Sequence, residues 1–275
     1  MNHNYLRWLS WAVAAVTALT LSVILAVSAT YVYLQPSLPT VEAMRSAELQ
    51  VPLRIYSRSG QLMAQIGEQR RIPMAYDQIP DVIKQAFIAA EDDRFFEHHG
   101  FDYQGILRSA FVNLVKGSRA QGASTITMQL ARNLFFEPAR RFDQSVDRKV
   151  FEVLMAHDLT ELFSKDEILE MYLNIIYFGH RAYGPEAAAQ TYFGKSAADL
   201  SMAEATLLAG LPQQPGEFDL FHNMASAKQR QRAAVDLEHL DGVRAFGHAL
   251  RVCLQVRPQV RHASGAPAIK DGLDP

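Results

Sequence analysis

The sequence has little cysteine and no excess of positive charge. Cys253 is the single cysteine in 275 residues, and 27 Lys and Arg against 29 Asp and Glu give a formal net charge of −2. One cysteine excludes an intramolecular disulfide framework and a zinc site built mainly on thiolates. The charge balance argues against a broad nucleic-acid surface, so we expect no nucleic acid among the partners. With 49% hydrophobic residues, the chain is long and apolar enough to bury a full core.

Charged residues are missing from one long stretch, positions 9–34. A run of this length can cross a bilayer as a helix. The alternative is a cleaved signal peptide with Val27 and Ala29 at its cleavage site, but the apolar part of a signal peptide is usually about 7–15 residues long. Length therefore favours a permanent transmembrane anchor. Arg7 precedes the stretch and indicates that residues 1–8 form a cytoplasmic tip.

The segment after the anchor, residues 35–72, is predicted to be a linker with short strands. Prolines in its first part resist helix formation. Residues 51–56 and 62–66 have the composition of two strands, and Ser59-Gly60 between them suits a hairpin turn. We therefore expect a small β-hairpin that leads into the main domain.

Helical periodicity dominates residues 73–235, which we expect to form one domain of the mainly α class. Asp81 is a predicted N-cap, and Ser164 and Ser201 each begin a capping-box sequence. Further helices are predicted over residues 106–114, 126–136 and 146–162. The tail, residues 236–275, matches no motif, and its Gly, Pro and charged residues favour weak order.

The first candidate site is the run EDDRFFEHHGFD, from Glu91 to Asp102. Glu91 ends a helical face that carries Ile83 and Phe87, so its carboxylate should be partly desolvated. Desolvation can raise the pKa of a carboxyl group towards the working pH, which suits general acid–base catalysis. The alternative is a solvated acidic helix end, which the residue types alone favour.

Three further clusters have both a functional and a structural interpretation. Small hydroxyl residues from Gly122 onwards lead into a helix and could bind phosphate together with arginines further on, or they could be an ordinary N-cap. Arg148 and Glu152 are four residues apart, so an intrahelical ion pair of about 0.3 kcal/mol is the simpler interpretation of a carboxylate among cations. Residues 174–195 alternate aromatic and small residues, which indicates tight packing, although Lys195 could face an anion.

The order and spacing of these segments are more specific than any one of them. In sequence order, EDDRFFEHHGFD, GASTITMQLARN, RKVFE, KDEILEMYLN, AYGPEAAAQTYFGK and LLAGLPQQP resemble family 51 glycosyltransferases. These are the peptidoglycan glycosyltransferase domains of class A penicillin-binding proteins and their monofunctional relatives. The resemblance covers about residues 5–235. It implies a lysozyme-like fold with a helical lobe, a membrane-dipping jaw and a cleft between them.

The resemblance also implies a reaction and its residues. Glu91 would be the general base that deprotonates the 4-hydroxyl of the lipid II sugar, whose oxygen then attacks the anomeric carbon of the growing chain with inversion and releases undecaprenyl pyrophosphate. Glu152 would be the second catalytic carboxylate, which holds a divalent cation, Mg²⁺ or Mn²⁺, or orients groups around the pyrophosphate. The residues implied to bind substrate are Asp92, Ser124, Thr125, Gln129, Arg132, Asn133, Arg140, Arg148 and Lys149.

The same resemblance implies a location and partners. We expect a single-pass protein of the bacterial inner membrane with its catalytic domain on the periplasmic side. Lipid II, the growing glycan chain, the membrane and other cell-wall synthesis proteins are the expected partners.

The sequence departs from the family pattern at several positions. Met128 replaces a usual glutamine, Arg132 replaces a lysine, and Asp219-Leu220 lies near an expected Asn-Pro. Neither Ser-x-x-Lys nor Lys-Thr-Gly occurs, so the sequence has no penicillin-sensitive transpeptidase site. We hypothesise a class A protein that is truncated or frame-shifted after Arg232.

Two alternative functions remain open from the sequence. An inactive, truncated membrane scaffold is favoured by the atypical tail and by Met128, and disfavoured by the intact Glu91 and Glu152. A lysozyme-like lytic enzyme shares the expected fold, but glycan hydrolysis needs no cationic clamp for a pyrophosphate.

Overall fold

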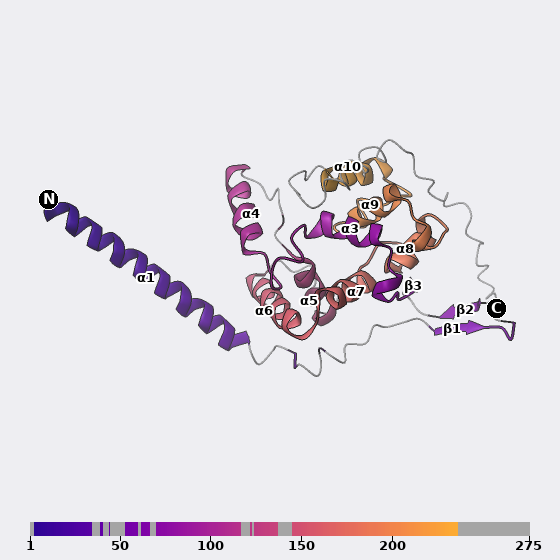
Figure 1. Ribbon diagram of the computed structural model, residues 1–275, viewed down its shortest axis with the longest axis horizontal. Helices are drawn as coiled ribbons and strands as arrows, with labels where there is room; N and C mark the ends of the chain where they lie inside the picture. Colours follow the sequence, from indigo (N-terminus) through magenta and orange to yellow (C-terminus); the bar gives the residue numbers. More distant parts are fainter. Residues whose placement is uncertain are drawn as a thin grey trace, which may run out of the picture. The chain divides into compact units, whose positions relative to one another are not determined.

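A computed structural model describes residues 3–34, 39–40, 44, 53–59, 62–66, 70–116, 122, 124–136 and 145–235 (Figure 1). The chain divides into two units, residues 1–45 and 46–275. The tail over residues 236–275 and the predicted substrate residue Arg140 lie outside the described residues.

The first unit contains the 32-residue helix α1, His3–Leu34. Its described apolar side chains are exposed, Trp11, Leu25 and Tyr33 among them. Within the described part of the chain, no helix combines the length and the apolar character that a membrane span requires. The transmembrane anchor over residues 9–34 stays a prediction.

The predicted hairpin opens the second unit. Strand β1, Leu53–Tyr56, pairs antiparallel with β2, Leu62–Ile66. The register places Leu53 opposite Ile66 and is interrupted between Ile55 and Tyr56. The sequence therefore predicted both strands, and residues 51 and 52 of the first prediction lie outside the described residues.

The rest of the described part of the second unit is mainly helical, as predicted (Figure 1). Two two-residue strands, β3 (Arg70–Arg71) and β4 (Ala182–Tyr183), pair in parallel. The helical elements in chain order are η2 (Tyr76–Gln78), α3 (Asp81–Glu91), α4 (Tyr103–Lys116), α5 (Ile126–Phe135), α6 (Val146–Leu162), α7 (Lys165–Ile175), α8 (Pro185–Tyr192), η3 (Ala197–Asp199), α9 (Met202–Gly210) and α10 (Met224–Val235).

The predicted helix starts are right in two cases and wrong in one. Ser164 and Ser201 cap α7 and α9 with the expected capping boxes, each closed by a glutamate three residues later. Asp81 is not the N-cap of α3, because the helix already begins at Asp81 and Pro80 occupies the cap position. An aspartate in the first turn still interacts favourably with the helix dipole, and Asp81 also pairs with Lys84 at 2.8 Å.

The core brings the end of α3 close to α5, α7 and α10. Helix α3 packs on α9 and α10, while α5 packs on α6 and α7. Phe87 of α3 is fully buried and meets Tyr172 and Phe178 edge-on, with ring centroids 6.4 and 5.7 Å apart. The predicted apolar face of α3 is therefore the buried one, and it carries Glu91 at its end.

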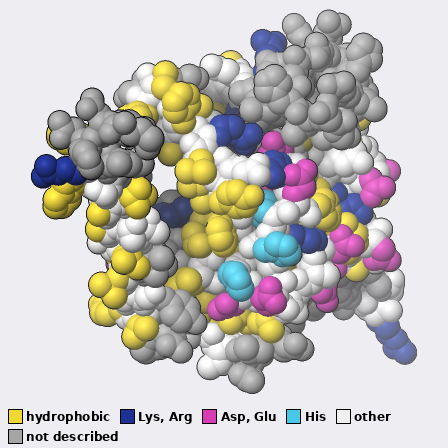
Figure 2. Space-filling model, turned by 60° about the vertical axis from the view of Figure 1, so that its left-hand side comes forward, with side chains coloured by type: hydrophobic (Ala, Val, Ile, Leu, Met, Phe, Trp, Pro, Cys, Tyr) yellow, Lys and Arg dark blue, Asp and Glu magenta, His cyan; other side chains and the backbone are white. Residues whose placement is uncertain are grey.

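Helix α4 projects from the helical body (Figure 1). Leu107, Phe111, Leu114 and Val115 are all exposed, with Leu114 81% accessible. On the side of the molecule seen in Figure 2, hydrophobic side chains gather beside a region of mixed basic, acidic and histidine side chains. The membrane-dipping element that the resemblance implies stays a prediction.

Candidate active site

The carboxylate of Glu91 has one oxygen that is hydrogen-bonded and one that is buried without a hydrogen-bond partner among the described residues. Its Oε2 accepts a hydrogen bond of 2.8 Å from Nε2 of Gln129 on α5. Its Oε1 lies 3.8 Å from the guanidinium of Arg230 on α10, and has no hydrogen-bond partner among the described residues. Only 10% of the side chain is exposed. An oriented, desolvated carboxylate with one unused oxygen is suited to accept a proton.

Burial raises the pKa of Glu91 above its ordinary value, as the sequence predicted. The hydrogen bond from Gln129 and the positive charges of Arg230 and Arg132 act in the opposite direction, while the charge of Asp92 adds to the rise. Desolvation thus favours the neutral form of the carboxyl group, while cations on two helices favour its charged form and limit the rise in its pKa.

The amide of Gln129 is itself positioned by a buried tyrosine. The hydroxyl of Tyr172, on α7, donates to Oε1 of Gln129 at 3.4 Å. Burial raises the pKa of Tyr172 well above its ordinary value, so this hydroxyl keeps its proton. The chain of contacts from Tyr172 through Gln129 to Glu91 joins three helices at one point.

Glu152 lies at the centre of a cationic cluster. The side chain is fully buried on α6, where Arg148 donates to its Oε1 and Lys149 donates to its Oε2 at 2.9 Å. Arg132, on α5, lies 3.8 Å from Oε1. The predicted intrahelical pair is therefore present, but it belongs to a larger network that spans two helices.

Lys149 and Arg132 extend this cluster towards the rest of the site. Lys149 also donates to the hydroxyl of Ser124 at 2.8 Å, just before α5 begins. Burial lowers the pKa of Lys149, and the charge of Glu152 partly opposes that change. Arg132 acts electrostatically on Glu91 as well as on Glu152. The structure thus brings the two predicted carboxylates into one electrostatic system.

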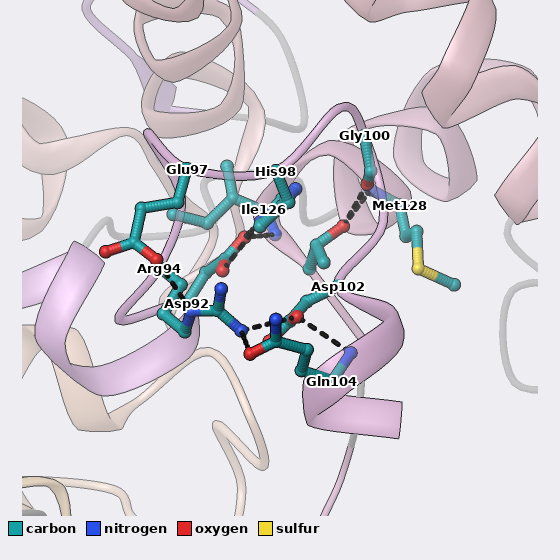
Figure 3. Close-up of polar contacts among 10 residues, drawn as sticks. Asp92, Arg94, Glu97, His98, Gly100, Asp102, Gln104, Ile126 and Met128 are labelled. Atoms are coloured by element: carbon teal, nitrogen blue, oxygen red, sulfur yellow. Dashed lines mark hydrogen bonds and ion pairs between the residues drawn. The ribbon is translucent and has the colours of Figure 1, made fainter. Parts of the chain in front are cut away.

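Asp92 and Thr125 connect the first motif to the start of α5. Figure 3 shows Asp92 between His98 and Ile126. The carboxylate of Asp92 is buried, accepts from Nε2 of His98 at 2.9 and 3.0 Å, and accepts from the backbone N–H of Ile126 at 3.0 Å. Thr125 is the N-cap of α5, which is the structural alternative that the sequence left open, and its hydroxyl donates to the carbonyl of Gly100 at 2.6 Å. The described polar contacts of both side chains are internal, and their contact with substrate stays a prediction.

The structure also describes three other residues that the sequence analysis singled out. Asn133 is half-buried on α5. Met128 is fully buried, and its backbone N–H donates to the hydroxyl of Thr125. Lys195, which the sequence offered as an anion ligand, pairs instead with Glu204 at 2.7 Å, because the capping box of α9 holds that carboxylate beside it.

Arg230 and Tyr172 are site residues that the sequence analysis missed. Arg230 comes from α10, a helix that the sequence analysis did not predict, and it approaches Glu91 because α10 packs on α3 and α9. Tyr172 was assigned only to helix α7. Neither residue carries a local sequence signal, since each is defined by a partner far away in the chain.

Comparisons with known proteins agree on one family. Residues 59–238 match the family described as Transglycosylase. The chain is 43% identical over 263 residues to penicillin-binding protein 1A of Escherichia coli, covering 88% of this chain and 30% of that protein. It is 46% identical over 205 residues to penicillin-binding protein 1A of Vibrio cholerae, covering 74% of this chain and 24% of that protein. The chain therefore spans less than a third of the length of these relatives.

A solved structure is also similar. The crystal structure of penicillin-binding protein 1A from Haemophilus influenzae aligns with a TM-score of 0.40 and 24% sequence identity, over 78% of this chain and 22% of that one.

Proposed function

The chain belongs to the transglycosylase family, and we propose that it is a peptidoglycan glycosyltransferase that polymerises lipid II into glycan strands. The observation that carries the proposal is Glu91, a buried carboxylate with one oxygen fixed by Gln129 and the other unused, next to a cluster of cations. This combination supplies the two things that glycosyl transfer from a pyrophosphate requires, a base for the acceptor and positive charge for the leaving group.

Glu91 would act on the acceptor sugar. Its Oε1, which has no hydrogen-bond partner among the described residues, accepts the proton of the 4-hydroxyl. The oxygen of that hydroxyl forms a bond to the anomeric carbon of the growing chain. The bond from the anomeric carbon to the pyrophosphate oxygen breaks on the opposite face, so the configuration inverts and undecaprenyl pyrophosphate leaves with the electron pair. Gln129 fixes the orientation of the carboxylate, because its amide donates to Oε2 only.

The cations around Glu152 would hold the pyrophosphate. Arg132 and Lys149 are 26% and 41% exposed at their side chains, whereas Glu152 is fully buried. Glu152 therefore serves to position the cations, and their outer sides face the leaving group. Charge-assisted hydrogen bonds from arginine and lysine are the strong contacts that a phosphate accepts. The other residues that we propose for substrate binding are Asp92, Ser124, Thr125, Asn133, Arg140 and Arg148.

The residues around Glu152 do not fit a metal ion held by the protein alone. Arg148 and Lys149 occupy its two oxygens, and Arg132 approaches one of them. A Mg²⁺ or Mn²⁺ ion usually needs several oxygen ligands, of which substrate phosphates can supply most. We therefore propose that the substrate pyrophosphate supplies most of the ligands of the divalent cation.

Membrane attachment completes the proposal. A lipid-linked substrate requires the site to work at a membrane surface, and the exposed apolar side chains of α4 supply a surface for the interface. We place the uncharged stretch 9–34 across the inner membrane as a single anchor, with the catalytic domain on the periplasmic side. The proposed partners are lipid II, the growing glycan chain and other cell-wall synthesis proteins.

The test compares the purified chain with two variants in a lipid II polymerisation assay in detergent with Mg²⁺. Glu91→Gln should lower the rate by roughly 10²–10⁴-fold, the usual contribution of a general base. Glu97→Gln is the matched control, because this carboxylate lies in the same motif but is 64% exposed and pairs only with Arg94 among the described residues, and its rate should stay close to that of the parent chain.

Two outcomes would contradict the proposal. If Glu91→Gln retained more than a tenth of the parent rate, Glu91 would not be the base. If the folded parent chain made no strands at all, the membrane-scaffold alternative would replace the glycosyltransferase. Release of fragments from finished peptidoglycan, with no requirement for lipid II, would favour the lytic alternative.

A further inference from the structure

Three side chains outside the proposed active site converge on one point. His180 lies in the loop between α7 and β4, and Asp219 and His222 lie in the loop before α10. Nε2 of His180 is 3.0 Å from Oδ2 of Asp219, and Nδ1 of His222 is 2.7 Å from the same oxygen. The three candidate ligand atoms all lie within 4.8 Å of one another, the only such group among the described residues.

Two of these side chains are held in place by their surroundings. Oδ1 of Asp219 accepts the backbone N–H of Phe221 at 2.9 Å, which leaves Oδ2 directed at the two imidazoles. The ring of His180 packs edge-on against Phe221 and Tyr192, with centroids 4.9 and 5.7 Å apart. The third group, His222, is 73% exposed, so a ligand can reach the cluster from solvent.

The backbone at His180 is also unusual. Its φ is +47° and that of Arg181 is +63°, two consecutive non-glycine residues in the left-handed region. Such a conformation costs free energy and persists where the surrounding structure imposes it. Here the hydrogen bonds from Phe178 N–H to the Ala182 carbonyl and from Ala182 N–H to the Gly179 carbonyl close the turn. His180 is therefore presented to Asp219 by a fixed loop.

We propose that His180, Asp219 and His222 bind a divalent transition-metal ion of the zinc type. Imidazole nitrogen favours Zn²⁺, Ni²⁺ and Cu²⁺ over Mg²⁺ and Ca²⁺, and a carboxylate oxygen completes a common ligand set for these ions. With metal–ligand bonds of about 2.0–2.2 Å, tetrahedral ligands lie about 3.3 Å apart. The two N–O separations of 2.7 and 3.0 Å are close to that value. The two imidazole nitrogens lie within 4.8 Å of each other, so they approach each other around the ion, and water fills the remaining position.

Metal binding requires no net loss of protons from neutral imidazoles. In the hydrogen-bonded arrangement each ring directs an N–H at Asp219 Oδ2. A neutral imidazole can move its proton to the other ring nitrogen, which leaves a lone pair facing the ion. The ion then replaces the two hydrogen bonds with three coordinate bonds, two from the imidazoles and one from Oδ2 of Asp219, and the carboxylate also balances part of its charge.

The proposed metal would join two loops. His180 belongs to the loop that leads into β4, whereas Asp219 and His222 directly precede α10, the helix that carries Arg230. The cluster shares no residue with the site around Glu91 and Glu152, so the proposed metal site does not depend on the proposed function. The simpler interpretation is a trio of hydrogen-bonded side chains that binds no ion, and the experiment separates the two.

Calorimetric titration of the full chain in detergent with Zn²⁺, after removal of metals with a chelator, tests the proposal. The variant His180→Asn with His222→Gln removes both imidazoles, and asparagine tolerates the left-handed φ at position 180. The control is His157→Gln on α6, an exposed histidine 3.7 Å from Asp158. Circular dichroism of each variant verifies the fold.

The parent chain and the His157→Gln control should bind one more equivalent of Zn²⁺ than the double variant, or bind it more than about tenfold more tightly. Zn²⁺ should also raise the melting temperature of the parent and of the control, but not that of the double variant. Equal stoichiometry and affinity in all three proteins would overturn the proposal, as would a parent chain that takes up no Zn²⁺. Polymerisation activity is not needed for either readout.

Discussion

Replacing Asp92 with alanine should destabilise the contact between the first motif and the start of α5. The side chain is 3% exposed and accepts hydrogen bonds from both the His98 ring and the backbone N–H of Ile126 (Figure 3). In Asp92→Ala both donors stay buried without this acceptor. A buried group that loses its partner costs about 1–3 kcal/mol, so two such groups cost roughly 2–6 kcal/mol of unfolding free energy.

The asparagine variant separates hydrogen bonding from charge. In Asp92→Asn the amide oxygen can still accept from Ile126, and the imidazole of His98 can present its other tautomer to the amide NH₂. The expected loss is therefore below about 2 kcal/mol. Asp81→Ala is the surface control, because its pair with Lys84 involves a carboxylate that is 83% exposed and should contribute at most about 0.5 kcal/mol.

Urea unfolding followed by far-ultraviolet circular dichroism measures these differences, and the polymerisation assay is run on the same preparations. We expect the order Asp92→Ala, then Asp92→Asn, then Asp81→Ala, from least to most stable. If the unfolding free energy of Asp92→Ala lay within about 1 kcal/mol of that of the parent chain and the variant still lost activity, the carboxylate would act on the substrate, as the resemblance implied. The proposal that Asp92 mainly stabilises the fold would then be refuted.

Two more predictions concern Arg230 and Gly100. Arg230 favours the charged form of Glu91, so Arg230→Gln should raise the pKa of that carboxyl further. The acid limb of the pH–rate profile should then move to higher pH, with most of the activity regained in alkaline buffer. An unchanged profile would show that Arg230 has no influence on the base. Gly100 has a φ of +85°, and an added Cβ would lie 2.4 Å from the backbone carbonyl oxygen of Ala156, so Gly100→Ala should cost more than about 2 kcal/mol in urea unfolding. A Cβ added at Gly122 meets nothing within 4 Å among the described residues, so Gly122→Ala should cost less than about 0.5 kcal/mol. Equal effects of the two substitutions would contradict the packing argument.

Local signals in the sequence predicted most helix positions. The capping boxes at Ser164 and Ser201 gave the starts of α7 and α9, because a side chain that bonds a nearby backbone N–H is a short-range event. Helix α6 has the predicted bounds, Val146–Leu162. Two helices were missed. Helix α8 was interpreted only as packing, and α10 has a polar sequence whose helicity depends on docking to α3 and α9.

The candidate site was predicted in part. Order and spacing of the motifs pointed to Glu91 and Glu152, and the apolar face of Ile83 and Phe87 pointed to a desolvated carboxylate, which the structure confirms. The sequence left open whether Glu152 was a simple intrahelical pair. Arg132 from a second helix settles that question, since a contact between helices cannot be read from spacing within one of them.

The sequence by itself determined the helical class, the hairpin and the family, because these depend on periodicity, caps and motifs that lie within short stretches. It predicted the roles of the two carboxylates through the resemblance. Only the tertiary structure decided which partners surround those carboxylates. Arg230 reaches Glu91 because α10 packs on α3, and His180 meets Asp219 because two loops fold together. Such pairings bring together residues far apart in the chain, and the free energy that selects them comes from burying a shared core rather than from any local pattern.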